Sequence, residues 1–491
     1  MSAHAQLLIV LLPLLAAPLA ALMRTPDAAW ALATAIAWSV LSLALLLLLQ
    51  VQAEGVLSYA IGGWAAPWGI EYRLDPLGAL LQLLLAAVAA AILPWTRQSA
   101  ARELERARLP GFYAALLLLQ AGLLGIVATG DAFNVFVFLE ISSLSTYALI
   151  AMGRDRRALT AAFRYLILGT LGATFYLIGV GLLYALTGTL NMADLAARLP
   201  AVADTRTAHT AVVFVTVGLG LKLAMFPLHA WLPNAYAYAP SAVTALLAAT
   251  ATKVALYVLV RFVWTIFGAE FAFGAIPLAA LLGVLAVLGM LIASAVAVRQ
   301  DEVKRLLAWS SVAQIGYALA GLALASGAGL AAALLHLANH GLMKGALFLA
   351  LGNIAWRFGN TRLSTLRGLG RAMPWTMAAF VAGGLSLVGV PLTVGFVSKW
   401  ALLQAALAAG AWWLVGAIAL ASLLALAYVW RVVEVAYFEA SESRDLRCEA
   451  PLGLLLPTWL LVLANLWLGI DTRWTLGLAE AAARALAGAG L

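Results

Sequence analysis

Uninterrupted apolar runs of about twenty residues recur from one end of this 491-residue chain to the other. A helix of ~20 residues is long enough to cross the hydrocarbon core of a lipid bilayer. Hydrophobic residues make up 65% of the chain and charged residues only 10%, which lies far outside the usual composition of soluble domains. The sequence therefore predicts an all-α polytopic membrane protein, with residues 1–491 forming a single membrane domain.

The apolar runs predict fourteen transmembrane helices joined by connections too short to hold a soluble domain. Because fourteen is even, both termini are expected on the same side of the membrane. In chain order, the expected spans lie near residues 5–23, 29–53, 74–95, 112–130, 132–152, 160–187, 209–231, 241–263, 274–297, 303–325, 328–355, 375–404, 411–438 and 451–470.

Positive charge is distributed unevenly between the two sides. Nineteen Lys and Arg residues, including Arg444 and Arg447, lie around the odd-numbered connections, and six lie on the opposite side. Cytoplasmic connections of membrane proteins carry an excess of Lys and Arg. We therefore expect a multi-pass cell-membrane protein with both termini on the outer, periplasmic side. The net charge of +8 is then a consequence of topology, and nucleic-acid binding is not expected.

Lysine is placed unusually in this chain. Lys304 is expected in a connection, whereas the other four lysines lie within apolar spans. A cation at the bilayer centre costs at least ~2.5–3.5 kcal/mol, so four of them together indicate a polar protein interior. A buried Lys can release and regain a proton, whereas Arg stays protonated, so these residues suit proton transfer. The alternative is that they snorkel to an interface or brace helices through hydrogen bonds. The four residues are Lys222, Lys253, Lys344 and Lys399.

Glu140 is the carboxylate that lies well inside an apolar span, in the segment FNVFVFLEISSLSTYALIAMG. A buried carboxylate needs a partner, and one of the buried lysines is the obvious candidate. Breaking such a pair would help the Lys to release its proton. A purely structural ion pair is the alternative interpretation.

The segment LLHLANHGLMKGALFLALGN spaces His336, His340 and Lys344 by four residues each, which places them along one face of a helix. Because the proton affinity of His is matched to neutral pH, such a row could pass protons through bound water. Hydrogen bonding between helices is the alternative. The segment has no Cys and no carboxylate, so a zinc site is not expected. We expect neither a metal nor a cofactor, and the single Cys448 excludes an internal disulfide.

Two prolines interrupt apolar spans close to a lysine. Pro227 follows Lys222 in LKLAMFPLHAWLP, and Pro391 precedes Lys399 in VPLTVGFVSKW. Proline breaks a helix locally, and non-helical backbone at membrane depth is tolerated where it lines protein or a watery cavity. The interrupted spans are the seventh and the twelfth. A five-helix unit at residues 112–263, repeated at 274–438, would therefore return in inverted topology, as in many secondary transporters.

Taken together, these segments resemble the antiporter-like subunits shared by respiratory complex I, membrane-bound hydrogenases and Mrp-type monovalent cation/proton antiporters. The resemblance covers roughly residues 75–440. It implies a fourteen-helix fold with two inverted five-helix repeats, each with one broken helix. It depends on the Glu140, His336–Lys344 and Pro391–Lys399 segments, on GLKLAMFPLHAWLPNAYAYAPSAVTALLAATATKVALYVLVRF and on DEVKRLLAWSSVAQIGYALAGL.

The resemblance also implies a role for each polar residue. Glu140 resembles the carboxylate paired with Lys222, and Lys253 resembles a bridging lysine. His229 and the row His336, His340 and Lys344 would form the intervening relay, and Lys399 would be the terminal lysine. The lysine at position 399, the FLEISS sequence around Glu140 and the chain length favour the D-type subunit of Mrp antiporters.

We therefore expect a secondary transporter subunit, and not an enzyme, that translocates protons in a hetero-oligomeric membrane complex coupled to Na⁺ or K⁺. The alternative is a proton-pumping subunit of complex I or of a membrane-bound hydrogenase, driven by redox chemistry in partner subunits. A structural scaffold without transport and an independent solute carrier are the remaining alternatives. The partners that co-purify with the chain would separate these hypotheses.

Overall fold

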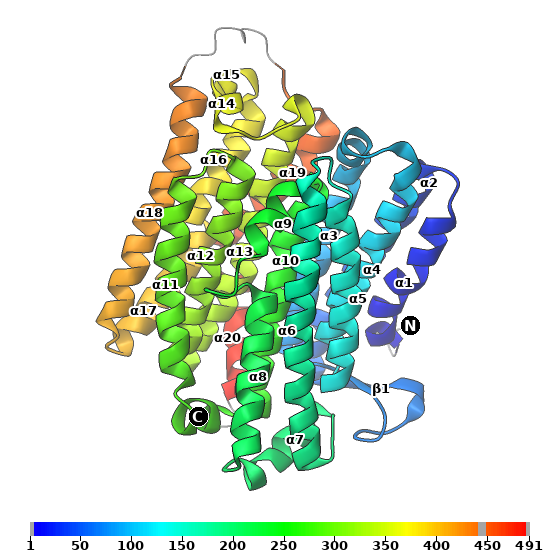
Figure 1. The fold of residues 1–491 in the computed structure, drawn as a ribbon, viewed down its shortest axis with the longest axis vertical. Coiled ribbons are helices and arrows are strands. Elements are labelled where there is room, and N and C mark those ends of the chain that lie inside the picture. Colours follow the sequence, from blue (N-terminus) through cyan, green and yellow to red (C-terminus); the bar gives the residue numbers. More distant parts are fainter. Residues whose placement is uncertain (1–3, 440–447, 488–491) are drawn as a thin grey trace.

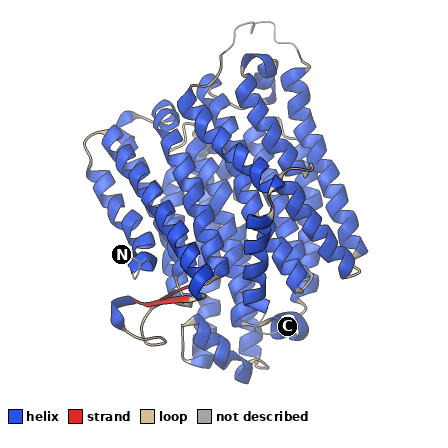
Figure 2. Ribbon diagram, turned by 180° about the vertical axis from the view of Figure 1, so that it is seen from behind, coloured by secondary structure: helices blue, strands red, loops and turns tan. Residues whose placement is uncertain are grey.

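The computed structural model describes residues 4–439 and 448–487, so Arg444 and Arg447 lie outside the described residues. The described chain is a bundle of helices that run roughly side by side, with one short β-hairpin at an end of the bundle (Figures 1 and 2). The first ten helices and strands are α1 (Ala5–Leu22), α2 (Pro26–Glu54), β1 (Leu57–Ala60), β2 (Glu71–Leu74), α3 (Pro76–Glu103), α4 (Leu109–Ala128), α5 (Ala132–Ala151), α6 (Arg157–Thr187), α7 (Met192–Arg198) and α8 (Arg206–Leu223).

The second part of the chain continues the same alternation of long helices and short connections. Its elements are α9 (Leu232–Tyr238), α10 (Ser241–Val260), η5 (Arg261–Ile266), η6 (Glu270–Ala275), α11 (Leu278–Val298), α12 (Val303–Ala323), α13 (Gly327–Phe358), α14 (Leu363–Leu366), α15 (Leu369–Ala372), α16 (Pro374–Val388), α17 (Val394–Ala408), α18 (Trp412–Tyr437), α19 (Leu452–Ile470) and α20 (Arg473–Ala487).

Twelve helices of the described chain are long and apolar enough to cross a membrane. The seventh and twelfth expected spans are instead broken, the former into α8 and α9 and the latter into α16 and α17. The two breaks fall at the prolines that the sequence singled out. Twelve continuous helices and two broken ones account for the fourteen predicted spans.

Successive connections alternate between the two ends of the bundle. Helices α14 and α15 lie at one end, and α7 and the β-hairpin lie at the other (Figure 1). The C-terminal helix α20 lies toward the same end as the hairpin (Figure 1). The division into repeats at residues 112–263 and 274–438 stays a prediction.

The β-hairpin and the helices α7 and α20 were not predicted from the sequence. Strands β1 and β2 pair antiparallel, with Leu57 opposite Leu74. Helix α7 has only 7 residues, and α20 carries its apolar side chains on one face. A search for long apolar runs does not detect short or one-sided elements, because polar residues interrupt their apolar residues too often.

Two basic residues were placed wrongly. Lys304 was expected in a connection because charged residues surround it, but it lies in the first turn of α12, where it is buried and donates to the carbonyl of Ala239 at 2.6 Å. All five lysines of the chain are therefore buried. Arg261 is one of the six basic residues that were expected from the sequence around the connections of the outer side, but it is buried and paired with Asp75.

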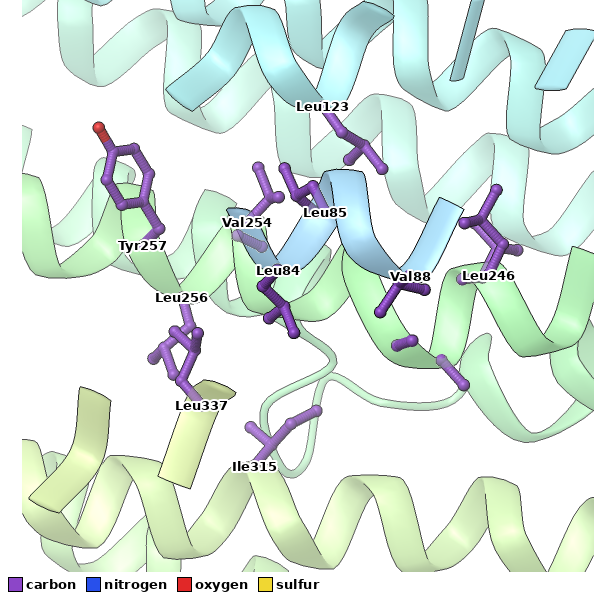
Figure 3. Packing of buried hydrophobic residues seen from close by; sticks show 14 of the residues in the cluster. Leu84, Leu85, Val88, Leu123, Leu246, Val254, Leu256, Tyr257, Ile315 and Leu337 are labelled. Atoms are coloured by element: carbon purple, nitrogen blue, oxygen red, sulfur yellow. The ribbon is translucent and has the colours of Figure 1, made fainter. Parts of the chain in front are cut away.

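Helices α3, α10, α12 and α13 form the centre of the bundle, and the side chains between them are mostly buried. Figure 3 shows apolar residues of these helices and of α4 closing the space around α10. This packing separates the interior polar groups from lipid. The labelled residues are Leu84, Leu85, Val88, Leu123, Leu246, Val254, Leu256, Tyr257, Ile315 and Leu337.

Candidate functional site

The structure brings Glu140 of α5 and Lys222 of α8 together. Lys222 Nζ lies 3.6 Å from Glu140 Oε1, and it donates a hydrogen bond to Ser143 Oγ at 2.7 Å. The Lys222 side chain is 4% exposed, whereas that of Glu140 is 24% exposed. The ammonium group is therefore held inside the bundle, and the carboxylate reaches it from the bundle surface.

Lys222 lies in the last turn of α8, directly before the helix break. Ala224 adopts a left-handed conformation with φ 59°, which ends the helix. The indole N–H of Trp231 then donates to the carbonyl of Leu221 at 2.8 Å. This bond satisfies a carbonyl that the broken helix leaves without its usual partner. The free carbonyls at a helix C-terminus also favour a cation at this position.

His229 lies in the turn between α8 and α9, beside the break. Its ring stacks on Phe226 at a centroid distance of 5.2 Å and meets the edge of Trp309 of α12 at 5.1 Å. The expected relay position is thus inside the protein and next to α12. Lys253 lies deeper, in α10, where its Nζ donates to the carbonyl of Ala248 at 2.5 Å and contacts Thr252 Oγ1 at 3.5 Å.

The predicted row on α13 is fully buried. The rings of His336 and His340 are nearly parallel, with centroids 6.0 Å apart, and His336 Nδ1 lies 3.0 Å from Ser398 Oγ of α17. Lys344 points toward α12 and donates to the carbonyl of Leu307 at 2.8 Å and to the Ser310 hydroxyl. The row therefore connects α17 at one end to α12 at the other.

Lys399 of α17 lies against the end of α16. Its Nζ donates to the carbonyls of Leu387 and Val388, both at 3.0 Å, and to Ser422 Oγ of α18 at 3.2 Å. Leu387 and Val388 are the last residues of α16, so the ammonium caps the C-terminus of that half-helix. Lys222 therefore lies on the half-helix that precedes the first break, whereas Lys399 lies on the half-helix that follows the second break.

Close packing holds the second break in place. A Cβ atom on Gly395 would lie 1.7 Å from the carbonyl oxygen of Ser386, so only glycine fits where α17 meets α16. The amide of Asn339 donates to the carbonyl of Val394 at 2.8 Å and ties the start of α17 to α13.

Several polar atoms along this line are buried without a hydrogen-bond partner among the described residues. Because orphaned buried polar atoms are rare, these atoms indicate positions for internal water. A cavity of about 20 Å³ beside Lys222, lined by Ser142, Ser143 and Thr146, is large enough for one water molecule. The orphaned atoms are Glu140 Oε1, His336 Nε2, His340 Nε2, and Gln314 Oε1 and Nε2.

The four lysines expected inside the membrane are between 0% and 5% exposed, and their ammonium groups bind interior oxygen atoms. Snorkelling to an interface is therefore excluded. The hydroxyl partners of these lysines were not predicted from the sequence. Ser143 could have been found, because it follows Glu140 by three residues and so lies on the same face of α5. The hydroxyl partners are Ser143, Ser310 and Ser422.

Comparison with known proteins gives one consistent result. The pattern of the family described as "NADH:quinone oxidoreductase/Mrp antiporter, TM" matches residues 129–425. The chain is 45% identical over 460 residues to NADH-quinone oxidoreductase subunit N of Desulforudis audaxviator (strain MP104C), covering 92% of this chain and 90% of the relative.

Two further similarities concern antiporters. The chain is 32% identical over 445 residues to the D-type subunit of the Na⁺/H⁺ antiporter of Bacillus subtilis (strain 168), covering 90% of this chain and 88% of the relative. The fold is similar to a chain in the structure of the Mrp complex from Dietzia sp. DQ12-45-1b, with a TM-score of 0.90, 28% sequence identity and coverage of 99% and 97%.

Proposed function

We propose that this chain, which belongs to the NADH:quinone oxidoreductase/Mrp antiporter family of membrane subunits, conducts protons along its line of buried basic residues. It is a multi-pass membrane protein and an antiporter-like transporter subunit. In the function we favour, it is the D-type subunit of a multi-subunit antiporter that exchanges Na⁺ or K⁺ for protons.

One observation carries the proposal. Lys253, Lys344 and Lys399 are buried and bind hydroxyls and carbonyls, without a carboxylate partner among the described residues. Burying an ammonium group without a counter-ion costs free energy. A hydrogen bond that only held two helices together would not require a charged side chain. Lysines that gain and lose a proton account for this arrangement, because the neutral amine is tolerated in the same site.

The order of the residues along the structure supports the following path. A proton enters beside Glu140, Lys222 and His229 and passes to Lys253. The α13 row of His336, His340 and Lys344 carries it onward, and it leaves beside Lys399. Separating Glu140 from Lys222 would change the proton affinity of Lys222, and each ~1.36 kcal/mol of lost interaction changes proton occupancy tenfold. This ion pair is therefore the gate in our account.

The membrane orientation that we propose follows from charge. The end of the bundle that carries most of the Arg residues faces the cytoplasm, and both termini face outward. The Glu140 side chain is 24% exposed on an otherwise apolar outer face of α5, and a carboxylate that faces lipid is costly, which supports contact of this face with another membrane subunit. The exposed apolar residues of this face are Phe133, Val137 and Leu144.

A subunit of a respiratory complex is the second candidate, and one observation favours it. The chain is more similar to the Desulforudis relative, which is named as a quinone oxidoreductase subunit, than to the Bacillus antiporter subunit, at 45% against 32% identity. The same path would then be driven by redox chemistry in partner subunits.

Inverted vesicles that contain the complete complex separate the two candidates. For an antiporter, adding Na⁺ or K⁺ to acid-loaded vesicles should release protons without any electron donor. For a respiratory subunit, only an electron donor together with its acceptor should drive proton movement. Proton movement under neither condition would contradict both.

A further inference from the structure

Lys344 and Lys399 are connected by a second set of polar residues, on the side of α12. Ser310, Gln314 and Tyr317 lie at intervals of four and three residues, so they share one face of the helix. All three are at most 1% exposed. A fully buried polar stripe on an otherwise apolar helix requires an explanation. We call these three residues the α12 polar row.

Each end of the α12 polar row contacts one of the two lysines. Lys344 Nζ donates to the Ser310 hydroxyl at the first end. At the other end the Tyr317 hydroxyl lies 3.1 Å from Ser422 Oγ, which accepts from Lys399 Nζ at 3.2 Å. Lys399 Nζ also lies 4.6 Å from the centre of the Tyr317 ring.

The middle of the row contains polar atoms that are not fully hydrogen-bonded by the protein. The hydroxyl of Tyr428 on α18 lies close to the side chains of Ser310 and Gln314, but neither this hydroxyl nor the Gln314 amide makes a well-aligned hydrogen bond among the described residues. Seven residues of helix rise ~10.5 Å, which about four hydrogen-bonded links of ~2.8 Å would cover. The Tyr428 hydroxyl and one or two waters held in place by the Gln314 amide suffice to complete the chain.

We propose that the α12 polar row, together with Ser422 and Tyr428, is a second proton route between Lys344 and Lys399, parallel to His336 and His340. The inference rests on the proposed function. A hydroxyl both donates and accepts a hydrogen bond, so it takes up one proton on a lone pair while releasing its own. The protonated Lys344 gives its proton to Ser310, the chain shifts by one bond at each step, and neutral Lys399 receives a proton from Ser422.

The test removes a single hydroxyl. Tyr317→Phe keeps the ring beside Lys399 but breaks the chain at Ser422. Tyr176→Phe is the matched control, because Tyr176 is equally buried and its hydroxyl donates to the carbonyl of Ala132 at 2.8 Å, far from this route. Both substitutions are made in the wild type and in a His336→Ala background, and proton flux is measured in vesicles containing the complete complex.

We expect Tyr317→Phe to lower the proton flux of the His336→Ala protein by about tenfold or more, since a positioned proton donor contributes at least that much, while Tyr176→Phe leaves it unchanged. In the same His336→Ala background, Ser422→Thr, which keeps a hydroxyl, should retain flux where Ser422→Ala loses it. An unchanged flux after Tyr317→Phe in both backgrounds, or an equal loss after Tyr176→Phe, overturns the inference. If Lys399→Ala also leaves flux unchanged, the proposed function itself fails.

Discussion

Each buried ammonium group of the proposed path is held by oxygen atoms of the protein, and only that of Lys222 has a carboxylate nearby among the described residues. Hydroxyls and carbonyls stabilise the charged form of Lys less than a carboxylate does. The charge at these positions therefore depends on small changes in hydrogen bonding. This is the property that a stepwise proton path needs at each of its sites.

A different arrangement is found at Asp75, which caps the start of α3 and pairs with Arg261, the first residue of η5. Arg261 Nη1 lies 2.6 Å from Asp75 Oδ2, and both side chains are nearly buried. Burial raises the pKa of Asp75, but Arg261, the Gly78 N–H and Arg73 outweigh it, so the pKa lies below its usual value. The carboxylate thus stays charged, as a structural pair requires.

Removing this charge should destabilise the protein. Asp75→Asn leaves Arg261 buried without a counter-ion, and we expect a loss of about 3–5 kcal/mol in the free energy of unfolding. Because the pKa of Asp75 is lowered on folding, the pair stabilises fully above ~pH 4 and its contribution is lost as the pH falls further. The wild type should therefore lose more stability on acidification than the variant does.

The apparent unfolding midpoint of the purified protein between pH 7 and pH 3 measures this effect. Asp27→Asn is the control, because the pair of Asp27 with Arg97 is more than half exposed and should contribute little. Equal losses in the two variants at pH 7 would show that the buried pair is not structural.

The positions of the buried lysines Lys222, Lys253, Lys344 and Lys399 could be predicted from the sequence, because charge in an apolar run is conspicuous. The burial of Lys304 could not, since charged residues surround it in the sequence. The serine and tyrosine partners could not be predicted either, because Ser and Tyr are common in membrane helices and their contacts come from other helices. Only the folded chain shows which hydroxyl faces which amine.

At the scale of helices, the two breaks determine where the proton-carrying residues lie. Pro227 and Pro391 predicted these breaks, because proline cannot continue the hydrogen-bond ladder. The sequence also shows that Lys222 precedes its proline and that Lys399 follows its own. It did not show at which residue each half-helix ends, which is set by the left-handed residues Ala224 and Gly389.

Gly395 tests the importance of the second break. Its Cβ in Gly395→Ala would collide with the carbonyl of Ser386, and relieving the clash should cost about 1–3 kcal/mol of stability and move Lys399. Gly416→Ala in α18 is the matched control, because its Cβ meets no atom within 4 Å and should stabilise the helix by about 1 kcal/mol. Thermal unfolding and proton flux are compared for the two variants.

We expect Gly395→Ala to lower both stability and proton flux. Gly416→Ala should raise stability and leave the flux unchanged. A Gly395→Ala protein with normal stability and flux would show that the contact between α16 and α17 is not required.

At the scale of the whole molecule, the number of spans and their alternation could be predicted, because both depend on apolar length and on charge. The β-hairpin and α20 could not, since each is stabilised by contacts with the rest of the bundle. Which helices pack against each other could not be predicted either. Most spans are apolar on several faces, so their hydrophobic residues show no helical periodicity that would identify the buried face.

The proposed orientation places the single Cys448 on the cytoplasmic side, in the connection before α19. A small membrane-impermeant thiol reagent should therefore label it in inverted vesicles and not in right-side-out vesicles. A double variant, Cys448→Ser with Asp204→Cys, moves the only thiol to an exposed position before α8, at the opposite end of the bundle. This variant should be labelled in right-side-out vesicles and not in inverted vesicles. Labelling of Cys448 from the outside would contradict the orientation.

The proposed proton path begins at the ion pair of Glu140 and Lys222. Proton flux in inverted vesicles that contain the complete complex tests this path, with Glu140→Ala and Lys222→Ala beside the wild type. Asp194→Ala, which breaks the surface pair with Arg198 on α7, is the control. We expect both path variants to lose flux by at least about tenfold while the control keeps it. Wild-type flux in both path variants, assembled to normal levels, would show that protons do not follow this path.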